Sequence, residues 1–123
     1  MKKSEAEVQG EIVTALELAG CTVYQTSTHG VRRGTGVSKG VPDLLVAHHE
    51  FKRGMMLGIE VKKPVGWKWS SPEQQRAHAS GHTVLATSAY DALTELLAIL
   101  SLRGTWNYEC RVRSLREQFK VAS

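Results

Sequence analysis

Apolar residues recur along this chain at two spacings, one typical of amphipathic helices and one typical of strands. Residues 4–19 carry apolar side chains at helical spacing: Val8, Ile12, Ala15, Leu16 and Ala19. Ser4 and Glu7 form the S-x-x-E pattern of a helix start, and Gly20 supplies a C-terminal stop. The chain therefore begins with a predicted amphipathic helix.

Two further helices are predicted in the second half of the chain. Ser71 precedes Pro72, and Gln74 completes an S-x-x-Q pattern, so a short helix is expected over residues 72–80, ending at Gly81. A longer helix after Ser88 has one apolar face: Ala89, Ala92, Leu93, Leu96, Leu97 and Leu100.

Four apolar segments between these helices are typical of strands: 21–26, 42–49, 55–63 and 83–87. The predicted order is α-β-β-β-α-β-α, which indicates an α/β fold with a small mixed β-sheet flanked by helices. At 123 residues the chain is expected to be one domain, with its core over about residues 4–100. Residues 101–123 form a C-terminal extension of unassigned role, whose apolar residues Val112, Leu115 and Phe119 either close the core or pair with a second subunit.

Cysteine and histidine positions argue against disulfides and zinc. Cys21 and Cys110 are too few for a disulfide scaffold and do not form a CxxC pair. His48 and His49 adjoin in a predicted strand, so they are expected to face opposite sides and not to share a metal. No stretch approaches the about 18 apolar residues of a membrane span. The basic and then amphipathic start has no apolar signal core, so no secretion signal is expected. We therefore expect a cytoplasmic protein with reduced thiols and no membrane partner.

The chain is moderately basic, with a formal net charge of +4, which favours a polyanionic partner. A glycine-rich loop over residues 27–41 carries Arg32, Arg33 and Lys39. These side chains either follow a nucleic-acid backbone or are simply solvated. Their position directly before Pro42 and Asp43 favours contact with DNA.

The segment 57–63, LGIEVKK, places charges within an apolar strand. Alternation puts Leu57, Ile59 and Val61 on one face and Glu60 and Lys62 on the other. Pairing of this strand with the preceding one, through an antiparallel turn, would bring Asp43 close to Glu60. Two converging carboxylates repel each other unless a cation lies between them, and oxygen ligands suit Mg²⁺ or Mn²⁺. In the alternative interpretation, Asp43 only caps a turn, and Glu60 and Lys62 form a weak ion pair on a solvated strand face.

Pro42-Asp43 followed by Glu60-Val61-Lys62 resembles the signature of the PD-(D/E)XK nucleases, and the wider pattern resembles their VRR-NUC branch. That pattern comprises Glu5 and Gln9 in the first helix, then GVPDLL, GIEVKK and SPEQQRAH, and it covers about residues 4–97. The resemblance implies a restriction-endonuclease-like fold. It also implies a metal-dependent DNA endonuclease, structure-specific for four-way junctions or flaps, that works as a homodimer.

The resemblance also implies roles for individual residues. Asp43 and Glu60 would hold Mg²⁺ or Mn²⁺ with the Val61 carbonyl, and Lys62 would be the catalytic lysine. Glu5 corresponds to the helical acid of the family, with Glu7 and Glu11 as alternatives. Gln74 corresponds to the glutamine that follows the core motif, although helix capping explains it as well.

The loop after the core motif supplies further candidates for nucleic-acid contact: Lys63, Trp67, Lys68 and Trp69. The two tryptophans either stack on unpaired bases or pack beneath the loop as part of the core. The alternative function is a non-catalytic nucleic-acid-binding module on the same fold. The intact set of acidic and lysine residues argues against that alternative, and a protein whose basic charge is incidental is a third, weaker possibility.

Overall fold

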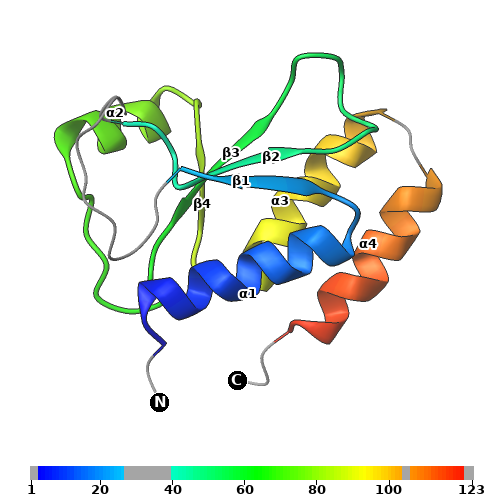
Figure 1. Cartoon of the computed structure of the whole chain (residues 1–123), viewed down its shortest axis with the longest axis horizontal. Helices are drawn as coiled ribbons and strands as arrows, with labels where there is room; N and C mark the ends of the chain where they lie inside the picture. Colours follow the sequence, from blue (N-terminus) through cyan, green and yellow to red (C-terminus); the bar gives the residue numbers. More distant parts are fainter. Residues whose placement is uncertain (1–2, 27–39, 104–105, 121–123) are drawn as a thin grey trace.

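The computed structural model describes residues 3–26, 40–103 and 106–120, except for the side chains of 103, 106 and 107. The elements in chain order are α1 (Glu5–Leu18), β1 (Thr22–Gln25), β2 (Leu44–Ala47), β3 (Leu57–Val61), α2 (Pro72–Ala79), β4 (Val84–Ala86), α3 (Ala89–Arg103) and α4 (Trp106–Gln118). The α/β class and the predicted order of the first seven elements are confirmed (Figure 1).

The four strands form one mixed sheet in the order β1-β2-β3-β4. β1 pairs with β2 and β2 with β3 in antiparallel fashion, whereas β3 and β4 are parallel. Parallel strands need a crossover connection, and α2 lies within it. The register aligns Leu44 with Ile59 and Leu45 with Gly58.

Helices α1 and α3 pack against each other and against the sheet, which they cover from one side (Figure 1). The predicted apolar faces are confirmed, because Ile12 and Leu16 of α1 and Leu93, Leu96 and Leu100 of α3 have no measurable exposure. At about 25 cal/mol per Å² of apolar surface removed from water, this core dominates the stability of the domain.

Within the C-terminal extension, residues 101–103 belong to α3 and residues 106–118 form α4, a helix that the sequence pattern does not assign. α4 packs along α3, Val112 is only 1% exposed, and Leu115 and Phe119 are partly buried against the core (Figure 1). Of the two predicted uses of this apolar face, the structure therefore shows closure of the core.

The prediction that His48 and His49 face opposite sides was wrong because β2 ends at Ala47, before both residues. In the turn that follows, side chains do not alternate, and the two imidazole rings stack with centroids 4.5 Å apart. Glu50 donates its backbone N–H to Nδ1 of His48. Burial, with a contribution from His49, lowers the pKa of His48 below 6.5.

No helix in the described parts of the chain combines the length and the apolar character that crossing a membrane requires.

Candidate active site

Asp43 and Glu60 meet at the ends of neighbouring antiparallel strands. Leu44 is the register partner of Ile59, so the residues immediately before Leu44 and after Ile59 come next to each other. The backbone N–H of Val61 donates a hydrogen bond of 2.8 Å to Oδ2 of Asp43. The predicted convergence of Asp43 and Glu60 across this strand pair is confirmed.

The Pro42-Asp43 turn packs closely against Gly58 of β3. A Cβ atom on Gly58 would lie 3.0 Å from Cγ of Pro42 and 3.3 Å from the carbonyl oxygen of His82, so a larger residue there would press on both. Thr26, just after β1, donates its backbone N–H to the Asp43 carbonyl and its hydroxyl to the Pro42 carbonyl. These contacts hold the turn, and the Asp43 carboxylate reaches the backbone of β3 at Val61.

The carboxylate of Glu60 is buried and incompletely satisfied. Its side chain is 1% exposed, and Oε1 accepts a 2.7 Å hydrogen bond from Nε2 of Gln74. Oε2 has no hydrogen-bond donor among the described residues. The Asp43 carboxyl lies within hydrogen-bonding range, but it can bond to Glu60 only by sharing a proton.

These surroundings raise the pKa of Glu60 from 4.5 to about 9. Burial is the largest cause, followed by the hydrogen bond and the negative charge of Asp43. The Lys62 ammonium acts in the opposite direction but does not outweigh them, and Glu5 raises the pKa further. The fold thus holds several acidic groups close together at a cost that a bound cation would relieve.

Lys62 is also almost wholly buried, with 1% of its surface exposed. Its Nζ donates a 3.1 Å hydrogen bond to Oγ of Ser70, which uses one of its three N–H donors. Its backbone N–H bonds to the Ala86 carbonyl of β4. A solvated surface pair of Glu60 and Lys62 was the alternative reading of this strand, and it was wrong because both faces of β3 are covered.

Gln74 connects the lysine and the glutamate. Its Oε1 accepts the backbone N–H of Ser70 at 2.9 Å, while its Nε2 donates to Glu60. Its own N–H bonds to Oγ of Ser71, so the predicted N-cap is present, yet the side chain does not return to Ser71 as in a capping box. Ser70 was not predicted as part of the site, and the only sequence signal for it was its position directly before the α2 cap.

Three acids in the first helix were candidates for the site, and their surroundings differ. Glu7 belongs to the helix cap, where its N–H and carboxylate both bond to Oγ of Ser4. Glu11 forms a 2.9 Å ion pair with Lys3. Glu5, half-buried at the start of α1, is the acid of this helix whose charge raises the pKa of Glu60. The geometry therefore favours Glu5 among the three.

The donor set suits a hard divalent cation. Among the described residues, no group of three or more histidine, cysteine, aspartate and glutamate side chains could hold a metal by itself. Asp43 and Glu60 supply two carboxylates, and within the described ranges Oε2 of Glu60 has no donor apart from a proton shared with Asp43. Mg²⁺ is commonly held by one or two carboxylates and completed by waters and substrate oxygens, so these residues fit it. The Val61 carbonyl stays a predicted third ligand.

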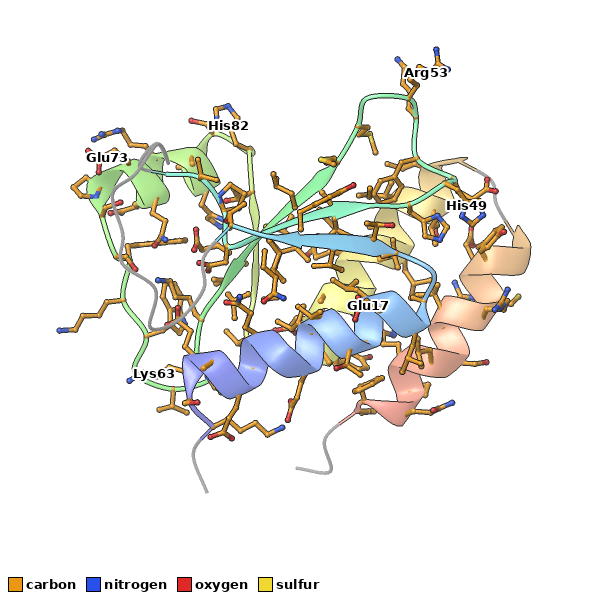
Figure 2. The ribbon with its side chains drawn as sticks, in the orientation of Figure 1. Glu17, His49, Arg53, Lys63, Glu73 and His82 are labelled. Atoms are coloured by element: carbon orange, nitrogen blue, oxygen red, sulfur yellow. The ribbon has the colours of Figure 1, made fainter. Side chains whose placement is uncertain are left out.

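The predicted nucleic-acid contacts lie partly within the described residues. Lys63 and Lys68 are exposed on the loop between β3 and α2, and Figure 2 shows Lys63 at the outer edge of the molecule. Trp67 and Trp69 are half-buried, and their rings meet edge to face with centroids 5.1 Å apart. The other predicted contacts lie outside the described residues: Arg32, Arg33 and Lys39.

Comparisons of the chain with models of protein families, with curated proteins and with solved structures find no match. The geometry of the site is therefore the basis for a proposed function, and the resemblance to the VRR-NUC nucleases stays an expectation.

Proposed function

We propose that this protein is a metal-dependent endonuclease that hydrolyses phosphodiester bonds of DNA. One observation carries the proposal: the carboxyls of Asp43 and Glu60 converge at the end of the β2–β3 pair, beside the buried Lys62. Paired oxygen ligands next to a cationic side chain are what phosphoryl chemistry needs, because negative charge builds up on the phosphate. The basic net charge of +4 agrees with a polyanionic substrate.

Asp43 and Glu60 would hold Mg²⁺ or Mn²⁺, with the Val61 carbonyl as the third protein ligand. A divalent cation bound there would polarise the scissile phosphate and lower the pKa of a water molecule. The Nζ of Lys62, held by Ser70, would donate a hydrogen bond to a phosphate oxygen as its negative charge increases. Glu5 would orient the attacking water, and Gln74 would fix the rotamer of Glu60.

The assay is cleavage of labelled four-way junction, flap, single-stranded and duplex DNA in Mg²⁺, Mn²⁺ or EDTA. Asp43→Asn is the informative variant because its amide oxygen still accepts the Val61 N–H, so the turn is retained while a charge is lost. Glu17→Gln, on the exposed side of α1, is the matched control (Figure 2). We expect metal-dependent cutting by the parent and the control, and a loss of about 100-fold or more in Asp43→Asn.

If no substrate is cut with either metal while DNA still binds, the catalytic proposal fails and the non-catalytic binding module replaces it. A homodimer that makes paired cuts belongs to the same proposal, and sedimentation with and without junction DNA tests it.

A further inference from the structure

The loop 63–69 is tied at both ends to the candidate site. Lys62, the residue that follows β3, precedes the loop, and Ser70 follows it. The hydrogen bond of 3.1 Å from Nζ of Lys62 to Oγ of Ser70 closes its base. The Ser70 backbone N–H is held in turn by Gln74, the residue that bonds to Glu60. The base of this loop therefore lies next to the residues proposed to cut DNA.

The two tryptophans anchor the loop. Trp67 meets Trp69 edge to face, and Trp69 also contacts His78 of α2, with ring centroids 5.2 Å apart. Both rings are half-buried, so much of their surface is already used within the protein. Of the two roles predicted for this pair, packing beneath the loop accounts for these contacts.

The tip of the loop presents a different apolar group. Gly66 has a φ of 74°, a left-handed conformation that favours glycine and turns the chain sharply there. Val65, immediately before it, is 61% exposed. Lys63 and Lys68 are exposed on either side. The side chain of Val65 is thus exposed to solvent, with Lys63 before it and Lys68 after it in the loop. The base of the loop is fixed by the hydrogen bond between Lys62 and Ser70.

We propose that Val65 is a wedge that enters DNA at an unstacked or branched base step, while Lys63 and Lys68 contact the flanking phosphates. This inference rests on the proposed nuclease function and names the substrate class that the site would prefer. Apolar side chains inserted between base steps cost a few kcal/mol of unstacking in continuous duplex, so they favour positions where stacking is already broken. The lysines supply attraction to phosphate without sequence preference.

The test measures binding separately from cutting. DNA carrying 2-aminopurine beside a branch point, and the same base within continuous duplex, are titrated with protein in EDTA and in Ca²⁺. Val65→Ser is compared with Leu102→Ser, a control at the end of α3 where Leu102 is 89% exposed, far from the loop (Figure 1). Lys63→Gln and Lys68→Gln are compared with Lys52→Gln in the exposed turn between β2 and β3.

We expect the parent to prefer branched over continuous DNA and to increase 2-aminopurine fluorescence at the branch. Val65→Ser should lower that preference about tenfold, the effect of losing one buried aliphatic contact, with duplex affinity unchanged. Lys63→Gln and Lys68→Gln should weaken binding to all DNA and reduce the salt slope by about one each. Leu102→Ser and Lys52→Gln should leave both quantities unchanged.

Equal preference and equal fluorescence in the parent and in Val65→Ser would overturn the wedge. Loss of self-association, rather than of branch preference, in Val65→Ser would assign the tip to a contact between two copies and would also overturn it. The nuclease proposal is judged separately, because metal-dependent cutting of any substrate that Asp43→Asn abolishes would stand whether or not the wedge does.

Discussion

Glu60→Gln should make the metal-free protein more stable at neutral and alkaline pH while abolishing cation binding. Glu60 has a pKa of about 9 in the folded chain and an ordinary value of 4.5, so the folded state retains a proton that the unfolded chain releases. The stabilisation from this proton is complete below pH 4.5 and is lost as the pH rises toward 9. A neutral glutamine still accepts the Gln74 amide hydrogen bond and has no charge to bury.

The size of the effect follows from linkage. One proton bound only by the folded state makes the free energy of unfolding fall by about 1.4 kcal/mol per pH unit. Between about pH 5 and pH 8, the metal-free parent should therefore lose roughly 4 kcal/mol through this group. His48 has the opposite sign, because its lowered pKa costs stability as the pH falls below 6.5. The difference between the parent and the variant isolates Glu60.

Urea unfolding in EDTA across this pH range measures the difference, with Glu17→Gln as the control for removal of an exposed acid. Saturating Mg²⁺ or Mn²⁺ should flatten the pH dependence of the parent, because a bound cation replaces the shared proton. It should leave Glu60→Gln unchanged. If Glu60→Gln and the parent lose stability in parallel from about pH 5 to pH 8, then Glu60 is ionised without penalty and the account of the carboxyl pair is refuted.

Two further predictions concern the support of the site and the core. Gln74→Ala removes the donor to Glu60 and the acceptor for Ser70, so Mn²⁺ affinity measured by calorimetry should fall about 10- to 100-fold, as for other residues that hold a metal ligand in place. Gln75→Ala, an exposed neighbour, should leave it unchanged, and equal losses in both would point to damage to α2 instead. Val112→Ala should lower the free energy of unfolding by about 2 kcal/mol because the side chain is 1% exposed, and the exposed Arg113→Ala should change it little. A Val112→Ala protein as stable as the parent would show that α4 does not contribute to the core.

Local pattern was sufficient for most of the fold. The 3.6-residue spacing in α1 and α3 and the apolar character of the β2 and β3 segments depend only on residues near in sequence. The Ser4 and Ser71 caps depend on a hydroxyl reaching an N–H three residues later, and both bonds are present. The prediction for His48 and His49 failed at an element boundary, where alternation ends with the strand.

The group formed by Asp43, Glu60 and Lys62 could be found from the sequence because these residues lie on or next to β2 and β3. One turn joins these two strands, and a turn fixes which strand ends meet. The sequence by itself determined that Asp43, Glu60 and Lys62 would lie together. Only the tertiary structure decided that both faces of β3 are covered, since that depends on helices and loops distant in the chain. Burial is the main cause that raises the pKa of Glu60 to about 9. The same tertiary packing brings Ser70 to Lys62 and Gln74 to Glu60.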